Sequence, residues 1–177
     1  VLTGSHQLSL HEAISQSLAG RTALLTLLPL SIAELKNNGI EFAADKHMLQ
    51  GGYPRVHQQN LDPTRAYADY YRTYIQRDVR QMINIKDLNL FEKFMKLCAG
   101  RIGSLFEASN LANEVGVSSH TINNWLSILE ASFIIFRLQP YFENFGKRVI
   151  KSSKIYFTDI GLASYLLDIE NIMQIKR

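Results

Sequence analysis

The sequence predicts a mainly α protein with a small amount of β, an α+β fold. Apolar residues recur at helical spacing along most of the chain, whereas only short runs have the composition of strands. In the C-terminal half, two helical segments joined by a glycine turn precede a run rich in Ile and Phe. That order is typical of a winged helix-turn-helix.

Composition sets the class of protein. With 46% apolar and 20% charged side chains, the 177 residues can pack a core as one domain or two small ones. Because Cys98 is the one cysteine, an intramolecular disulfide and a Cys-based zinc site are excluded. The net charge of +3 and the pI near 9.0 permit nucleic-acid binding without requiring it.

No segment of the sequence is predicted to be a membrane span or a signal peptide. The most apolar stretch, 23–30, is well short of the roughly 20 residues that a span requires, and it contains Pro29. The N-terminus lacks a basic region followed by a long apolar one. We expect a cytoplasmic protein with no membrane partner.

The first hundred residues are predicted to be mostly helical with one strand. A short helix is predicted over 7–18, and the Leu- and Thr-rich segment 22–28 is predicted to be a buried strand. Ser31 and Glu34 form a capping-box pattern that starts a helix. Further helices are predicted over 41–50, 62–83 and 90–99, with a sharp break at 51–54 and with Asp62-Pro63 as the clearest helix start.

The winged helix-turn-helix is predicted from residues 109–158. A short helix over 109–115 leads through Gly116 to a second helix that Ser118 caps and that ends near Ala131. Strands are predicted within 133–138 and 148–158, and the helix near 91–100 supplies the first helix of the module. The second helix has apolar residues at i, i+3, i+4 and i+7, which we expect to face the core: Ile122, Trp125, Leu126 and Leu129.

The opposite face of that second helix is the candidate functional surface. Asn pairs bidentately with adenine, and Ser and His bond phosphates or base edges. Basic residues follow in the predicted wing, with no acidic residue among them. The DNA-binding candidates are Ser119, His120, Asn123, Asn124, Lys147, Arg148, Lys151 and Lys154, with Ser127 on the same helix face.

A role without nucleic acid is the open alternative, because the outward helix face carries no Arg or Lys. Winged modules also serve as protein contacts or lids, and a short basic run is often a solvated face. The two hypotheses differ in one structural respect. A face buried on the helix that carries Tyr67–Tyr74 favours a regulatory scaffold, whereas a face that is open and continuous with the basic hairpin leaves the DNA hypothesis standing.

Other chemistries find no support in the sequence. It has no Gly-rich loop ending in Lys-Ser/Thr and no Gly-x-Ser-x-Gly elbow. The five histidines include no i, i+4 pair suited to a metal, so we predict no metal site. Cys98 lies on an apolar stripe and is predicted to be a small buried hydrophobe.

Several segments in fixed order resemble one protein family. Residues 2–5, 17–21 and 28–34 resemble the last part of an AAA-type core. Gly51-Gly52-Tyr53-Pro54 and residues 71–78 resemble the lid that follows it, and residues 155–162 resemble the start of a further domain. Over nearly its whole length the chain thus resembles a prokaryotic AAA-type P-loop ATPase family with a C-terminal winged-helix and nuclease-like region of unknown function.

The resemblance implies that the chain is an internal fragment of such an ATPase. On that basis the expected parts are the C-terminal remnant (tail) of the AAA α/β core at 1–38, the helical lid at 39–86, the winged helix-turn-helix at 87–158 and the start of a truncated nuclease-like domain at 159–177.

The resemblance also implies roles for individual residues. Ser5 matches a polar sensor position, and Arg21 matches an arginine that acts on phosphate in the manner of an arginine finger. Gly52 and Pro54 match the lid turn that approaches the nucleotide. Walker A and Walker B have no counterpart in the chain, so ATP and Mg²⁺ are implied for an intact ATPase, and none is expected for this chain, which by itself is expected to be inactive.

Two functions are therefore expected. In the first, the winged helix couples nucleotide state to contact with double-stranded DNA. In the second, it is a structural or regulatory protein-interaction module that binds no nucleic acid. The expected partners are the missing ATPase core, the missing C-terminal domain and further copies of the chain.

Overall fold

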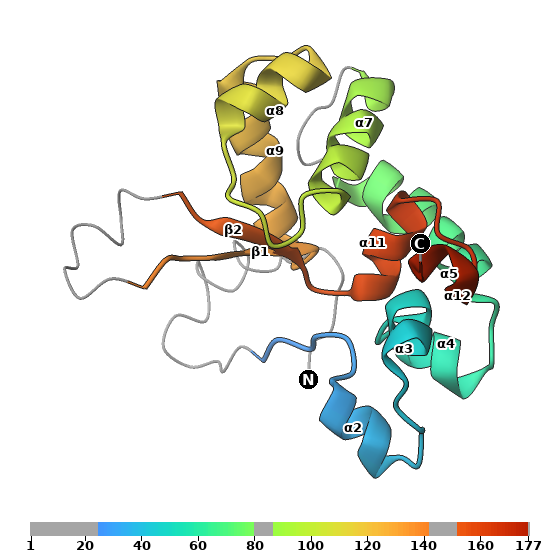
Figure 1. Cartoon of the computed structure of the whole chain (residues 1–177). Helices are drawn as coiled ribbons and strands as arrows, with labels where there is room; N and C mark the ends of the chain where they lie inside the picture. Colours follow the sequence, from blue (N-terminus) through green and yellow to red (C-terminus); the bar gives the residue numbers. More distant parts are fainter. Residues whose placement is uncertain (1–24, 80–86, 142–151, 177) are drawn as a thin grey trace, which may run out of the picture.

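The computed structural model describes residues 25–79, 87–141 and 152–176, and it is mainly helical with one small sheet (Figure 1). The predicted fold class is therefore confirmed. The helices are α2 (Ile32–Asn37), α3 (Ala44–Gln50), α4 (Pro54–Gln58), α5 (Pro63–Tyr70), the π-helix η1 (Tyr71–Val79), α7 (Leu88–Ala99), α8 (Ala108–Val115), α9 (Ser119–Ala131), α11 (Ile160–Leu166) and α12 (Ile172–Ile175), and the strands are β1 (Ile135–Leu138) and β2 (Lys154–Phe157).

The capping box predicted at Ser31 is confirmed at the start of α2. The Ser31 Oγ accepts from the Glu34 N–H at 3.3 Å, and the Glu34 carboxylate accepts from the Ser31 N–H at 2.8 Å. The strand predicted at 22–28 is wrong for residues 25–28, which are exposed and belong to no strand, and no described strand pairs with them. Residues 22–24 and the helix predicted at 7–18 lie outside the described residues.

The helix predicted over 62–83 begins as expected but changes type. The Asp62 carboxylate accepts from the Arg65 N–H at 2.8 Å, and Pro63 takes the first helical position of α5. From Tyr71 the helix continues as the π-helix η1, whose i→i+5 bonds leave no signature in the apolar spacing. Helix α3 starts three residues later than predicted, at Ala44, and the short helix α4 was not predicted.

Helices α7, α8 and α9 pack as a three-helix unit beside the hairpin of β1 and β2. We call residues 87–141 and 152–158 the winged-helix module, a label taken from the sequence prediction for this segment. Asp87 caps α7, whose first turn lies two residues earlier than predicted. Aromatic rings form the centre of the module: Phe91 meets Trp125 edge-on at 5.3 Å between ring centroids, and Phe94 meets Trp125 at 5.3 Å. These three side chains are buried, so they hold α7 against α9.

The sheet is a single antiparallel pair. Its register places Ile135 opposite Phe157 and Leu138 opposite Lys154. The free edge of β1 is occupied by a side chain, because the Glu130 carboxylate accepts from the Arg137 N–H at 3.2 Å and pairs with its guanidinium. Of the strands predicted within 148–158, β2 covers 154–157, and residues 148–151 lie outside the described residues.

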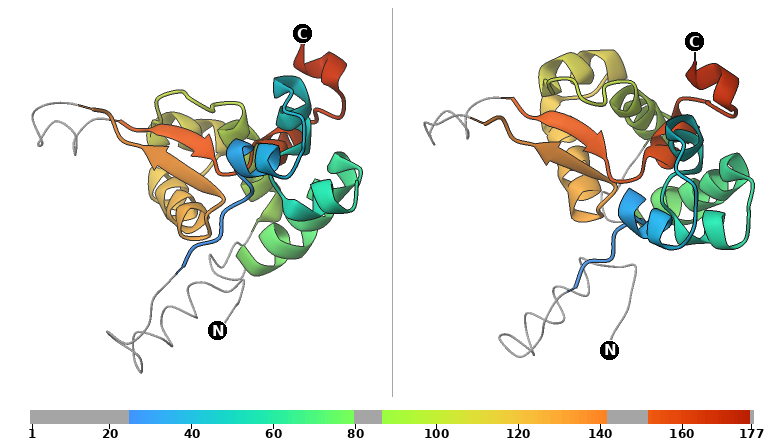
Figure 2. Two further views of the ribbon diagram at one scale, coloured as in Figure 1. Left: turned by 90° about the horizontal axis from the view of Figure 1, so that it is seen from below. Right: turned by 60° about the horizontal axis from the view of Figure 1, so that its bottom comes forward.

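Helix α11 joins the winged-helix module to the helices that precede it (Figures 1 and 2). It follows β2 directly and packs against α3, α5 and α7. The Ser164 hydroxyl adds a hydrogen bond of 2.7 Å to the Met48 carbonyl of α3. Along the described stretches of the chain, no helix has the length and apolarity that crossing a bilayer requires.

Candidate nucleic-acid interface

Helix α9 presents the polar face that the sequence predicts. Its start is fixed by Ser118, whose Oγ accepts from the Thr121 N–H at 3.1 Å. Gly116 adopts a left-handed conformation with φ of 93°, which ends α8 and turns the chain into α9. The four predicted core residues Ile122, Trp125, Leu126 and Leu129 are buried, and the five predicted outward residues Ser119, His120, Asn123, Asn124 and Ser127 are exposed.

The outward face of α9 is open among the described residues. Helix α9 packs against α7, α8 and β1, whereas the helix that carries Tyr67 packs against α11 instead. Tyr67 and Tyr71 are buried in the core on that side. The first part of the criterion, an accessible face, is therefore met, whereas continuity with the basic hairpin involves Lys147, Arg148 and Lys151, which lie outside the described residues.

Two of the outward side chains contact each other. The Asn124 Nδ2 lies 3.1 Å from the His120 Nε2, one helical turn away on the same face of α9. Asn123 has no such partner among the described residues. The face thus contains one amide held by a neighbour and one that is free to rotate.

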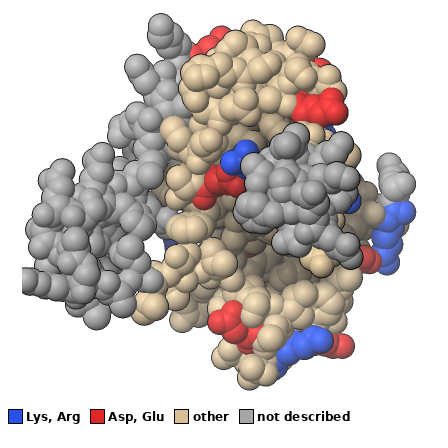
Figure 3. Space-filling model, turned by 90° about the vertical axis from the view of Figure 1, so that its left-hand side faces the viewer, with Lys and Arg blue, Asp and Glu red and all other residues tan. Residues whose placement is uncertain are grey.

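The charge of the described module is balanced. Five basic and five acidic side chains belong to it, and Figure 3 shows charged groups only in scattered places on this side of the molecule. Two acidic residues are paired with arginines, Glu114 with Arg101 and Glu130 with Arg137. The basic candidate Lys154 is exposed on β2, whereas Lys147, Arg148 and Lys151 lie outside the described residues.

A buried carboxylate lies between the winged-helix module and the preceding helices. Asp159 is 4% exposed and follows β2. Its Oδ2 accepts from the Gly52 N–H at 2.7 Å, and its Oδ1 caps α11 by accepting from the Leu162 N–H at 3.0 Å. A carboxylate with two backbone donors is stabilised in a site that would otherwise disfavour its charge.

Glycines allow the chain to close around this carboxylate. A Cβ at Gly51 would overlap the Tyr67 hydroxyl and the Asp159 carboxylate, and a Cβ at Gly161 would overlap the Tyr67 ring. The Tyr67 hydroxyl donates to the Gln50 carbonyl at 3.0 Å, and burial beside the Asp159 carboxylate raises the pKa of that phenol. We call Gly51, Gly52, Tyr67, Asp159 and Gly161 the Asp159 junction.

Gly52 and Pro54, which match the lid turn in the resemblance, lie in different environments. Gly52 is buried, and its carbonyl accepts from the Leu30 N–H at 2.7 Å while its N–H donates to Asp159. Pro54 is exposed and lines a cavity of about 480 Å³ with the rings of Tyr53 and Tyr70. Ser5 and Arg21 lie outside the described residues.

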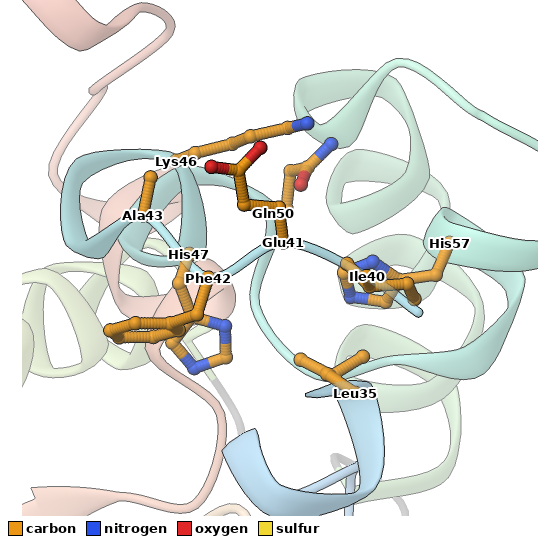
Figure 4. A pocket seen from close by; sticks show the side chains of 9 residues that line it. All are labelled: Leu35, Ile40, Glu41, Phe42, Ala43, Lys46, His47, Gln50 and His57. Carbon is orange, nitrogen blue, oxygen red and sulfur yellow. The ribbon is translucent and has the colours of Figure 1, made fainter. Parts of the chain in front are cut away.

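A second hollow, between α2, α3 and α4, is too small for a ligand. It has a volume of about 10 Å³, which is at most the room for one water molecule. His47 and His57 line it with Leu35 and Phe42 (Figure 4). The His57 Nε2 lies 2.8 Å from the Gly51 carbonyl, and burial lowers the pKa of His47. Among the described residues, no three His, Cys, Asp or Glu side chains gather as metal ligands do.

Cys98 is fully buried on α7, as predicted from the apolar stripe. Burial raises the pKa of its thiol to about 12, so the thiol is protonated and unreactive at neutral pH.

Sequence reasoning did not assign a role to Asp159, although an Asp directly before Ile-Gly-Leu is a recognisable helix-capping signal. That signal predicts the cap and not the bond to Gly52.

A family model described as a domain of unknown function (DUF8612) matches residues 41–172, and the chain therefore belongs to that family. An uncharacterized protein of Mycobacterium tuberculosis is 30% identical over 179 residues, covering 100% of this chain and 40% of the relative. Uncharacterized proteins of Haemophilus influenzae and Methanocaldococcus jannaschii are 24% and 25% identical, covering 99% and 94% of this chain and 50% and 42% of the relatives. The chain thus spans half or less of the length of these relatives, and no solved structure matches it.

Proposed function

We propose that this member of the family is the lid and winged-helix part of a nucleotide-gated protein whose helix α9 contacts double-stranded DNA. The observation that carries the DNA contact is the open polar face of α9, on the second helix of a helix-turn-helix. Lys154 on β2, with Lys147, Arg148 and Lys151 in the chain between β1 and β2, supplies positive charge for the phosphates.

The Asp159 junction supports the proposed coupling. One carboxylate bonds the Gly51–Gly52 turn to the residue that follows β2, and the Thr158 N–H donates to the Ile134 carbonyl of the hairpin at 3.0 Å. A displacement of the turn would therefore be transmitted to the winged-helix module without passing through a flexible linker. In this proposal the turn moves with the nucleotide state.

The chain itself lacks the phosphate-binding loop that would hold the nucleotide. No Gly-rich loop ending in Lys-Ser/Thr occurs in the sequence, so ATP and Mg²⁺ would be bound by polypeptide outside this chain. The lid would contribute the exposed Pro54 side of the turn, because both backbone groups of Gly52 are already bonded. Ser5 and Arg21 stay as the proposed sensor and arginine-finger residues of that site.

Fluorescence anisotropy of a labelled random duplex across a salt series tests the DNA contact. Three or four phosphate contacts predict a slope of log affinity against log salt near −3, at about −0.9 for each contact. Neutralising Lys151 and Lys154 to Gln should make the slope shallower by about 2. Lys93→Gln, on the exposed side of α7, is the matched control and should leave the slope unchanged. Absence of binding at low salt would contradict the proposal.

One observation favours a second candidate, a protein-interaction module. The outer side of the hairpin is apolar and open: Phe136 is 47% exposed and Leu138 is 52% exposed. Phe136 also lines a groove of about 540 Å³ with Leu28 and Phe133. If the duplex does not bind, Phe136→Ser and Leu138→Ser should weaken association of this chain with the proposed ATPase core, whereas Ser127→Ala on α9 should not.

A further inference from the structure

The contact between His120 and Asn124 restricts what the α9 face can present to a ligand. Asn124 donates one amide N–H toward the His120 Nε2, at 3.1 Å. A ring nitrogen that accepts carries no proton, so the proton of the neutral ring is on Nδ1. The Asn124 amide is thereby oriented with its Oδ1 and its second N–H free for an outside partner.

One acceptor beside one donor is the pattern that an adenine edge matches. In the major groove, adenine presents N7 as an acceptor and the N6 amino group as a donor, and Asn pairs with both atoms. Guanine presents two acceptors there, so a fixed amide oxygen would have no donor to meet on that base. A fixed amide therefore distinguishes adenine from guanine better than a rotating one does.

The position of the pair on the fold fits such a contact. His120 and Asn124 lie in the first two turns of α9, and the N-terminal residues of this helix are the ones that reach base edges in helix-turn-helix proteins. The neighbouring residues Ile122 and Trp125 are buried, so the rotation of α9 about its axis is fixed by the core. Asn123 has no partner to orient its amide within the described residues.

We infer that Asn124, oriented by His120, is the adenine-specifying residue of the α9 face, an inference that rests on the proposed DNA contact. Asn124 touches the base, and His120 acts as a positioning residue that selects the orientation of the amide. The basic residues of the wing contact phosphates and carry no sequence preference.

A duplex library with eight randomised base pairs, selected on the whole chain and sequenced, tests this inference. The wild-type chain should prefer adenine at one position by roughly tenfold, the size expected of a bidentate Asn–adenine pair. Asn124→Ala should abolish that preference, and His120→Ala should reduce it severalfold while retention of the total library changes little. Asn113→Ala, an exposed Asn on α8, is the control and should leave the preference intact.

A second duplex separates the atoms involved. Replacing the preferred adenine by 7-deazaadenine removes the N7 acceptor and should weaken wild-type binding roughly tenfold, with no effect on Asn124→Ala. Retention of the library without any base preference, or an adenine preference that survives Asn124→Ala, would overturn this inference and leave the DNA contact standing. A library that is not retained at low salt would overturn the proposed function as well.

Discussion

The core of the winged-helix module and the Asp159 junction are both buried, but they are stabilised by different means. The module has an apolar core in which Phe91, Phe94 and Trp125 pack ring against ring. The junction has a carboxylate, a phenol and glycines in its place. Apolar packing tolerates small changes of shape, whereas a buried charge with fixed donors tolerates almost none. The difference suggests that the module is the stable unit and that the junction sets its position.

Removing a ring from the module should have the largest effect on folding. Phe94 is fully buried between Phe91 and Trp125, so Phe94→Ala should lower the free energy of unfolding by roughly 3 to 5 kcal/mol. Phe136→Ala removes an equally large but half-exposed ring and should cost far less. Urea denaturation of the two variants gives the comparison, and equal losses would contradict the core described above.

A methyl group at the junction should be the next most destabilising change. Gly51 has φ of 62°, and an added Cβ overlaps two junction side chains, so Gly51→Ala should cost about 3 kcal/mol or more. Gly116 has φ of 93° with open space around it, so Gly116→Ala should cost about 1 to 2 kcal/mol from backbone strain alone. Thermal unfolding of both variants separates overlap from strain, and a Gly51→Ala loss no larger than that of Gly116→Ala would rule out the overlap.

Neutralising the Asp159 carboxylate should lower the free energy of unfolding somewhat less than adding a methyl group at Gly51 does. Asp159→Asn keeps the shape but weakens the bonds to the Gly52 and Leu162 N–H groups, with an expected loss of about 2 to 3 kcal/mol. Asp168→Asn is the matched control, because its pair with Lys96 is exposed and should contribute less than about 1 kcal/mol. Similar unfolding midpoints for the two variants would show that Asp159 does not hold the junction.

The smallest expected effect is a pH dependence in the core of the module. Burial raises the pKa of the folded Cys98 thiol to about 12, whereas the unfolded thiol ionises near pH 9. The contribution of this thiol to the free energy of unfolding is therefore fully present below pH 9 and decreases above it. Between pH 8 and 10 the wild-type chain should lose about 1 kcal/mol of its free energy of unfolding through this group. Cys98→Ala should lack that share of the loss, and identical pH profiles for the two chains would contradict it.

Local patterns in the sequence predicted the module well. The caps at Ser31, Asp62 and Ser118 and the inward stripe of α9 each depend on residues within one or two turns of one another. The contact between His120 and Asn124 is also local, but the sequence alone did not single it out from the other polar residues of that face.

The parts that escaped prediction depend on distant or absent neighbours. The bond between Asp159 and Gly52 joins residues 107 positions apart, and no periodicity reports such a contact. The apolar run at 25–28 has the composition of a strand but has no described strand beside it, so composition was misleading there. The π-helix η1 begins inside a segment whose apolar spacing looks α-helical, which hides the change of hydrogen bonding.

Amide hydrogen exchange at Gly52, followed by NMR, tests most directly the claim that the junction joins the two parts. The N–H is buried and donates to Asp159 at 2.7 Å, so we predict that it exchanges as slowly as the amides of α9 that surround Trp125. Slow exchange would mean that the turn and the module open together as one unit. Exchange as fast as that of the exposed turn residue Gly39 would contradict the account, because the turn would then move independently of the winged-helix module.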